Sequence, residues 1–217
     1  LYHHDKYEEW SLPLGFSNEL EIQGINIKRL KFNDPSEFKL PNNIYIKKNN
    51  IEVLLIFYAG HSEYLDKELI TFKKNNPFII IINELGDEPQ TRTLNYIRAS
   101  ISDISLSPDY ESYLYWKKKG FNCYWFTHWA DTKIFYNKKN RKRNLLIGTT
   151  AGKRKYTLML KMIFMNKFQN KKLKDKQNTE FYNDTKIAFQ YARWSEITRR
   201  IFEAGACGCC VITNKLP

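Results

Sequence analysis

Residues 195–213 read SEITRRIFEAGACGCCVIT and predict one short helix followed directly by one buried strand. Ser195 or Thr198 offers the hydroxyl that suits the start of a helix, because it can accept a hydrogen bond from a free backbone N–H. Gly208 provides the left-handed residue that commonly follows a last turn. Residues 209–212 are a short apolar run, which is typical of a buried strand.

The polar side chains of this predicted helix indicate an anion-binding site. Arg199 and Glu203 are four residues apart and therefore share a face, with Arg200 beside them. A helix start favours an anion, and a guanidinium can bind a phosphate through two N–H groups. A carboxylate one turn deeper can accept hydrogen bonds from the two hydroxyls of a ribose. The pattern therefore predicts a nucleoside diphosphate site. The alternative is a simple ion pair on a helix surface, worth a few tenths of a kcal/mol.

Residues 200–208, followed by Val211, Ile212 and Thr213, resemble the signature of group 1 glycosyltransferases, and most closely that of the CgeB-like (spore maturation) branch. The resemblance implies the two-lobed GT-B fold, a ribose-binding role for Glu203 and basic residues that hold the pyrophosphate. The wider superfamily often has a second glutamate eight positions earlier, which touches the donor sugar. Ser195 stands at that position here, so this contact is not matched.

Composition and charge describe a folded protein with an excess of positive charge. The chain has 217 residues, 42% of them hydrophobic and 15% aromatic, which suits one or two domains. No apolar run approaches the roughly 20 residues that span a membrane, and no signal peptide is visible, so we expect a cytoplasmic protein. The net charge of +12 attracts phosphates, nucleic acid or anionic lipid. Its clusters, which solvated loops also explain, are residues 138–143, 153–155 and 171–174.

The four cysteines predict neither disulfides nor a metal site. Cys207, Cys209 and Cys210 are too close together for ordinary disulfides with each other, and Cys123 is the only other partner. Their spacing matches no usual zinc pattern. We therefore expect reduced, buried, small hydrophobic side chains and no metal.

Residues 1–135 alternate between strand and helix patterns, which favours an open parallel sheet with right-handed crossovers. We expect an N-terminal Rossmann-like lobe here, on the acceptor side. The predicted strands are 25–32, 51–58, 78–82, 101–106 and 121–126, and the predicted helices are 7–22, 63–74, 91–100 and 110–119.

Residues 136–217 predict a second Rossmann-like lobe on the sugar-nucleotide side, so the fold class is α/β with two parallel-sheet lobes. We expect a strand at 144–148 and helices at 156–164 and 181–191. Between these helices the chain is short of sequence for further strands, so this lobe is expected to be incomplete. Residues 127–135 resemble the interdomain linker of two-lobed glycosyltransferases, and we expect the lobes to meet near 127–143.

Ligands of such sheets bind at the carboxyl ends of the strands, which selects two loops of the first lobe. His61 follows one predicted strand and can act as a base or donor near neutral pH. Glu84, Asp87 and Glu88 follow the next and can order the hydroxyls of an acceptor sugar. The alternatives are a structural histidine and a solvated acidic turn.

The turn after the first strand of the second lobe also exposes backbone N–H groups to an anion. Related glycosyltransferases carry a basic residue six places after its glycine, and Arg154 stands six places after Gly148. The usual second base directly after the glycine is Thr149 here, and Lys153 can substitute for it. A solvated turn is the alternative for Lys153 and Arg154.

The resemblance thus implies a glycosyltransferase of the hexosyltransferase type. It would move a sugar from a nucleotide-sugar substrate to a carbohydrate, protein or lipid acceptor, without cofactor or metal. Its expected residues are catalytic Arg154, Arg199 and His61, donor-binding Gly148, Thr149, Lys153, Arg200 and Glu203, and acceptor-binding Glu84, Asp87 and Glu88. One alternative is a non-catalytic sugar- or nucleotide-binding protein of the same fold. Another is a basic nucleic-acid-binding protein, which the aromatics in apolar runs argue against.

Overall fold

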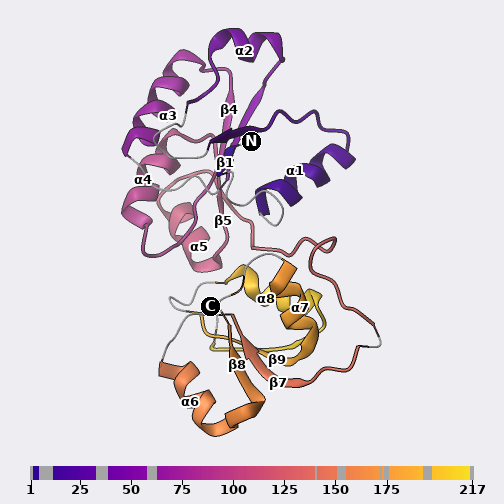
Figure 1. The fold of residues 1–217 in the computed structure, drawn as a ribbon. Helices are drawn as coiled ribbons and strands as arrows, with labels where there is room; N and C mark the ends of the chain where they lie inside the picture. Colours follow the sequence, from indigo (N-terminus) through magenta and orange to yellow (C-terminus); the bar gives the residue numbers. More distant parts are fainter. Residues whose placement is uncertain are drawn as a thin grey trace. The chain divides into compact units, whose positions relative to one another are not determined.

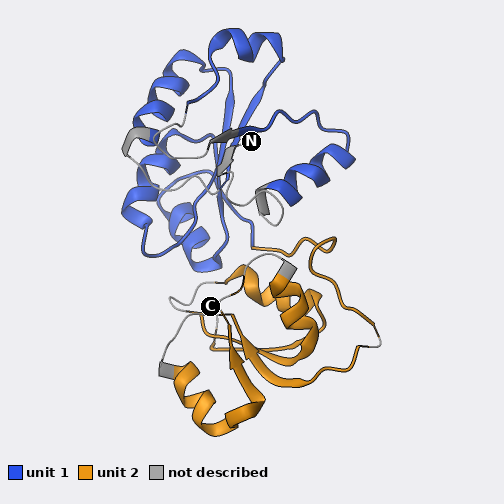
Figure 2. Cartoon of the chain, viewed as in Figure 1, with its two compact units in different colours: residues 1–127 blue, residues 128–217 orange. Residues whose placement is uncertain are grey.

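The computed structural model describes residues 2–4, 12–32, 39–57, 63–139, 141–150, 155–171, 173, 176–192 and 197–215. The chain forms two compact units, residues 1–127 and 128–217 (Figure 2). Each unit is built on its own parallel sheet, which confirms the predicted α/β class. Among the helices that the structure describes, none is both long and apolar enough to cross a bilayer.

Unit 1 holds a six-stranded parallel sheet in the order β2-β1-β3-β4-β5-β6. This order reverses direction at β1 and β3, as in doubly wound folds. The strands are β1 (Tyr2–His4), β2 (Leu30–Phe32), β3 (Val53–Ile56), β4 (Ile80–Glu84), β5 (Ile104–Ser107) and β6 (Cys123–Trp125).

The helices of unit 1 lie on both faces of its sheet, as right-handed crossovers require. Figure 1 shows α3, α4 and α5 together on one face and α1 on the other. The helices are α1 (Leu12–Ile22), α2 (Asn43–Lys48), α3 (Glu63–Asn75), α4 (Arg92–Ile101) and α5 (Tyr110–Lys118). The apolar faces of α3, β3 and β4 form the main core, in which Ile56, Leu69 and Ile81 are fully buried.

Unit 2 holds a four-stranded parallel sheet in the order β10-β9-β7-β8. Figure 1 shows α7 and α8 on one face of this sheet and α6 on the other. Its elements are β7 (Leu145–Thr149), α6 (Lys155–Phe164), the 3₁₀ turn η3 (Met165–Lys167), β8 (Phe168–Asn170), α7 (Lys176–Asp184), β9 (Thr185–Gln190), α8 (Arg199–Ala206) and β10 (Cys210–Thr213).

The predicted helix at 181–191 was wrong, because residues 185–190 form strand β9. The segment alternates Thr185, Ile187 and Phe189 with other residues, which is a strand period. The fully buried Ala188 lies between Gly148 of β7 and Val211 of β10. The expected lack of strands between the predicted helices was also wrong, because β8 lies at 168–170.

The linker ahead of β7 belongs to the fold of unit 2. Asp131 caps a turn, because its carbonyl accepts from the backbone N–H of Phe135 at 2.7 Å and its carboxylate accepts from that of Lys133 at 2.9 Å. This turn places the Phe135 ring, 2% exposed, in the core of unit 2. The boundary between the units therefore falls at residues 127 and 128, earlier than the division at 135 and 136 that the sequence predicts.

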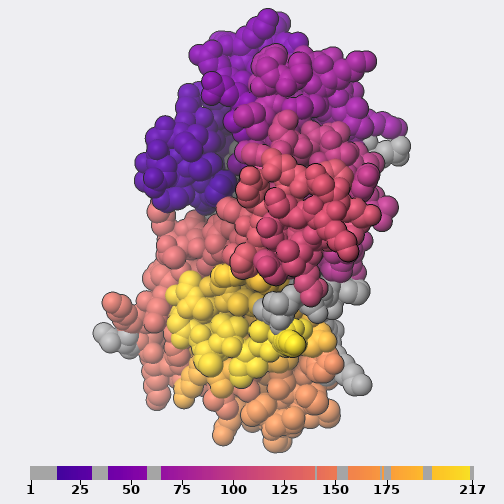
Figure 3. Space-filling model, turned by 180° about the vertical axis from the view of Figure 1, so that it is seen from behind, coloured from indigo at the N-terminus to yellow at the C-terminus, as the bar shows by residue number. Residues whose placement is uncertain are grey.

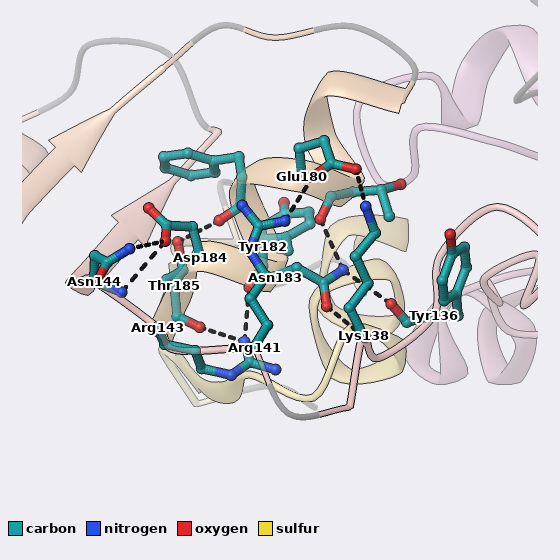
Figure 4. Close-up of polar contacts among 12 residues, drawn as sticks. Tyr136, Lys138, Arg141, Arg143, Asn144, Glu180, Tyr182, Asn183, Asp184 and Thr185 are labelled. Atoms are coloured by element: carbon teal, nitrogen blue, oxygen red, sulfur yellow. Dashed lines mark hydrogen bonds and ion pairs between the residues drawn. The ribbon is translucent and has the colours of Figure 1, made fainter.

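Two residues of the basic run at 138–143, Lys138 and Arg141, contact α7 (Figure 4). Lys138 and Arg141 both form ion pairs with Glu180. Asn183 accepts from the backbone N–H of Lys138 at 2.7 Å and donates to the carbonyl of Tyr136 at 2.9 Å. These contacts fix the linker along α7, so a large part of this basic cluster serves the structure of unit 2.

Arg143 joins the ends of three elements of unit 2. Its Nη1 donates to the carbonyl of Tyr182 at 2.8 Å, in the last turn of α7, and to that of Thr185 at 2.6 Å, at the start of β9. Its Nη2 donates to the carbonyl of Cys207 at 2.6 Å, at the end of α8. The last carbonyls of a helix attract cations and have no partners within the helix. One guanidinium therefore satisfies the ends of both α7 and α8.

The signature helix forms where the sequence predicts it, and Gly208 ends it with φ +78°. The N–H of Cys209 then donates to the carbonyl of Ala204 at 3.0 Å, which closes the last turn. Thr198 occupies the cap position at the other end, but its hydroxyl makes no capping hydrogen bond. Ser195 lies outside the described residues.

We expect Arg143→Ala to lower the free energy of unfolding by about 2–4 kcal/mol, because three carbonyls lose a charged donor. Arg143→Lys should recover only part of this loss, since an ammonium lacks the planar fork that reaches several acceptors. Chemical denaturation measures both variants. Lys139→Ala, an exposed position in the same linker, is the control. A wild-type midpoint for Arg143→Ala would contradict the role described here.

Candidate functional site

The strand order of unit 2 places the switch point of its sheet between β7 and β9. From β7 the chain crosses to β8 on one side, while β9 lies on the other side. Loops from such neighbouring strands separate, and ligands bind in the crevice that results. The helix α8 begins after β9 and carries the arginines and Glu203 of the signature. The candidate site is therefore described from these elements.

Glu203 is a buried carboxylate one turn inside α8. It is only 3% exposed, and its Oε1 lies 3.3 Å from Nε of Arg199 in an ion pair. Burial raises the pKa of Glu203 above the ordinary 4.5, although the charges of Arg199 and Arg200 oppose this. Burying a carboxylate costs several kcal/mol unless partners compensate it, and the raised pKa shows that the arginines compensate only in part.

A buried polar cluster lies beside Glu203. The hydroxyls of Thr150 and Tyr182 are 2.8 Å apart, and Nε2 of Gln190 donates to the Tyr182 hydroxyl at 3.2 Å. All three side chains are at most 5% exposed. Burial and then the negative charge of Glu203 raise the pKa of Tyr182, which locates the phenol close to that carboxylate. The cluster combines the ends of β7 and β9 with α7 and α8.

The two predicted donor-binding residues of β7 lie within the packed structure. A Cβ at Gly148 would come within 2.7 Å of the Thr185 hydroxyl and 2.8 Å of the Phe181 ring. The glycine is therefore required for close packing of α7 on β7. Thr149 is fully buried at the end of the strand. Their predicted contact with a donor stays a prediction.

The arginines of α8 differ in environment. Arg200 is exposed in the first turn, while Arg199 is partly covered and pairs with Glu203. His128, at the start of the linker, lies near Arg199. Burial and then the Arg199 charge lower the pKa of His128 to about 4, so its imidazole is neutral at pH 7. The site thus contains two cations, one buried carboxylate and one neutral imidazole.

Three predicted site residues, Lys153, Arg154 and His61, lie outside the described residues. Their assignments stay predictions. In the sequence, they stand between Thr150, which belongs to the buried cluster, and Lys155, where α6 starts.

In unit 1, Glu88 is enclosed by its own neighbours. Its side chain is fully buried, and its carboxylate accepts from Nδ2 of Asn95 at 2.7 Å, from Nε1 of Trp116 at 3.1 Å and from Nε of Arg92 at 3.1 Å. These bonds join the loop after β4 to α4 and α5. A contact with a sugar hydroxyl would have to displace one of these donors.

The other two predicted acceptor residues differ from Glu88 and from each other. Glu84 is 7% exposed at the end of β4, whereas Asp87 is exposed in a turn with φ +55°. A cavity of about 650 Å³ in unit 1 lies between α1 and the sheet, and none of the three carboxylates lines it. The predicted contact of these carboxylates with an acceptor stays a prediction.

The cysteines of unit 2 have the environment of hydrophobic side chains, with one exception. Burial raises the pKa of Cys207 to about 12 and that of Cys209 to about 11, so both thiols are protonated and poor nucleophiles. Cys210 is exposed, contrary to the expectation that all four are buried. No group of three metal-ligating side chains gathers within the described ranges.

Sequence reasoning missed Tyr182, Thr150 and Gln190 as members of this site. Tyr182 and Gln190 both fell within the helix predicted at 181–191, where Gln190 in fact belongs to β9. A strand prediction for residues 185–190 would have placed Gln190 at a carboxyl end, next to the end of β7. The carboxyl end of this strand was therefore the feature of the sequence that could have identified Gln190 as a site residue.

Comparison with known proteins bears on the same unit. Residues 134–217 match the glycosyl transferase-like family. The match covers β7 to β10 together with α8 and its buried Glu203, and it starts one residue before the buried Phe135. The similarity therefore lies in unit 2, in its parallel sheet and in the helix that carries Glu203. No curated protein matches the chain.

We expect Glu203→Gln to change how the stability of unit 2 depends on pH. Because the pKa of Glu203 is raised in the folded state, folding favours the protonated carboxyl. The stability that Glu203 contributes in this form is fully present below pH 4.5 and is lost as the pH rises through the folded pKa. Glutamine mimics the protonated form. The variant should therefore be at least as stable as wild type at pH 7, measured by thermal unfolding from pH 4 to 8. A clearly lower melting temperature at pH 7 would identify the ion pair with Arg199 as stabilising.

For unit 1, Glu88→Ala should lower the free energy of unfolding by about 2–4 kcal/mol, because three donors lose their acceptor. Glu88→Gln keeps one acceptor oxygen and should lose less. Chemical denaturation compares both with Glu111→Ala, an exposed carboxylate on α5. If Glu88→Ala unfolds like wild type, the buried carboxylate is free for another role.

Proposed function

We propose that the chain is a glycosyltransferase whose nucleotide-sugar donor binds at the carboxyl edge of unit 2. The observation that carries this proposal is the buried Glu203 one turn inside α8, with Arg199 and Arg200 at the helix start, inside the region that matches the glycosyl transferase-like family. We further propose that the chain belongs to the CgeB-like branch, because an arginine shortly precedes Phe202 and Glu203.

The arginines and the helix start would stabilise the leaving diphosphate. As the bond to the sugar breaks, negative charge develops on the diphosphate, and fixed positive groups then bind it more strongly than the ground state. Arg200 is exposed in the first turn and can reach a phosphate without breaking a protein contact that the structure shows. Arg154, and Lys153 with it, would contribute from the loop after β7. This chemistry needs no metal or further cofactor.

Glu203 would accept hydrogen bonds from the ribose hydroxyls. Its raised pKa marks a carboxylate whose charge is not fully compensated by protein groups. Ligand hydroxyls would supply the missing donors. The Tyr182 hydroxyl, held by Thr150 and Gln190, lies beside it and can orient either the carboxylate or the sugar. Buried polar groups held in this way are preorganised for a ligand.

Unit 1 would supply the acceptor side, with His61, Glu84 and Asp87 as the candidate groups at the strand ends. The acceptor is proposed as a class only: a carbohydrate, protein or lipid hydroxyl. Glu88 would then act through packing of the loop, given its three protein donors.

Two other functions make different predictions. A nucleic-acid-binding protein would use its basic runs on the surface, but Lys138, Arg141 and Arg143 form contacts within unit 2. A non-catalytic binding protein of the same fold would bind the nucleotide without turnover. That alternative remains an outcome of the experiment.

The experiment measures binding of UDP, GDP and ADP by calorimetry, and hydrolysis of the matching sugar nucleotides. We expect one nucleoside diphosphate to bind, with Glu203→Gln losing about 1–3 kcal/mol of affinity. Arg200→Ala and Arg154→Ala should each lower turnover by about 10²–10³-fold. Lys133→Ala, which removes one exposed positive charge from the same unit, is the control.

The outcomes separate the three functions. Binding without hydrolysis or transfer to any acceptor indicates a binding protein. Binding of single-stranded nucleic acid with a steep salt dependence, and without preference for one nucleoside diphosphate, indicates a nucleic-acid-binding protein. Equal losses in Lys133→Ala and Arg200→Ala would show that general charge, rather than the helix site, attracts the ligand.

A further inference from the structure

The outer face of α6 is apolar and exposed. Met162 is 74% exposed, Ile163 61% and Leu158 56%, and Met159 and Met165 nearby are 45% and 72% exposed. The positions i, i+1, i+4 and i+5 lie on one side of a helix, so Leu158, Met159, Met162 and Ile163 share one side of α6, and Met165 follows directly in η3. We call Leu158, Met159, Met162, Ile163 and Met165 the α6 patch.

This arrangement inverts the usual pattern of a surface helix, which packs its apolar stripe and exposes its polar one. The side of α6 that is covered carries Thr157, which is 4% exposed, and the half-buried Leu160 and Phe164. The helix therefore has apolar residues on the solvent side beyond those needed for packing on its own sheet. Contiguous exposed apolar surface of this kind commonly marks an interaction site.

The chain around the patch is basic and contains no acid. Residues 153–174 include no aspartate or glutamate, and their cations are Lys153, Arg154, Lys155, Lys161, Lys167, Lys171, Lys172 and Lys174. Of these, Lys161, Lys167 and Lys171 are described and exposed, on α6, on η3 and directly after β8. The patch is thus accompanied by positive charge along its own helix and beyond its end.

An apolar helix face with lysines beside it fits the surface of an anionic lipid bilayer. The apolar side chains would enter the boundary between headgroups and acyl chains, and the lysines would bind the headgroups. A second copy of the chain fits less well, because the same lysines would repel each other. A nucleic acid would use the lysines but would leave the methionines and Ile163 without a partner.

We propose that α6 and η3 form a membrane-surface binding site that places unit 2 on anionic lipid. The site requires no helix across the bilayer, because the helix lies along the interface. It is independent of the proposed glycosyl transfer, since none of the α6 patch belongs to the site around Glu203.

The test is co-sedimentation of the whole chain with vesicles of phosphatidylcholine alone, or of phosphatidylcholine with phosphatidylglycerol. We expect binding only to the anionic vesicles. Met162→Gln with Ile163→Gln should reduce partitioning by at least about tenfold without a change of charge. Replacing Lys161 and Lys167 by glutamine should cost roughly fivefold for each lysine. Both positions of the first variant are exposed, so its thermal unfolding should match wild type.

The matched control is Ile44→Gln, an equally apolar side chain that is 78% exposed on α2 of unit 1, which should bind like wild type. Absence of wild-type binding to anionic vesicles would overturn the proposal. So would unchanged binding of the Met162→Gln, Ile163→Gln variant, because charge alone would then explain attraction. A wild-type dimer in light scattering that this variant converts to a monomer would assign the patch to a protein interface instead.

Discussion

The guanidinium of Arg143 is the contact on which the geometry of unit 2 depends. It binds carbonyls at the end of α7, at the start of β9 and at the end of α8, all of which lie about 40 or more residues after Arg143 in the sequence. Packed helices leave their last carbonyls without partners, and buried ones need a donor. By meeting this requirement, one residue of the linker fixes the two helices that carry Tyr182 and Glu203. The position of the candidate site therefore follows from an interaction at the opposite end of α8.

Glu203 shows why this part of the molecule differs from an ordinary surface helix. Arg199 is its neighbour in the expected i,i+4 pair, but the carboxylate is almost completely buried and the pairing does not offset the loss of water. A group held at such a cost is common at functional sites. The neighbouring hydroxyl of Tyr182 is held by Thr150 and Gln190, so the polar groups are ordered without a ligand.

Local patterns predicted most of the fold, and long-range contacts account for what they missed. The apolar runs predicted β3, β4 and β7, and Gly208 predicted the end of α8. These features depend on residues that are neighbours in the sequence. The segment 185–190 has a strand period that the predicted helix overlooked, and its pairing with β7 and β10 fixes it as β9. For the same reason the motif predicted Arg199 and Glu203, while Tyr182 and Gln190 join the site only through the tertiary fold. The burial of Glu88 likewise depends on Trp116 and Asn95, which no spacing reveals.

The linker has a consequence for how the two units can be exchanged or separated. Phe135 fills the core of unit 2, Lys138 and Arg141 hold α7, and Arg143 joins the helix ends. A fragment that starts at β7 would expose a hole where the phenyl ring belongs and would lose all of these donors. Recombination between related chains, natural or by design, would therefore preserve unit 2 only when the crossover falls before Asp131. The connecting segment is structurally a part of unit 2.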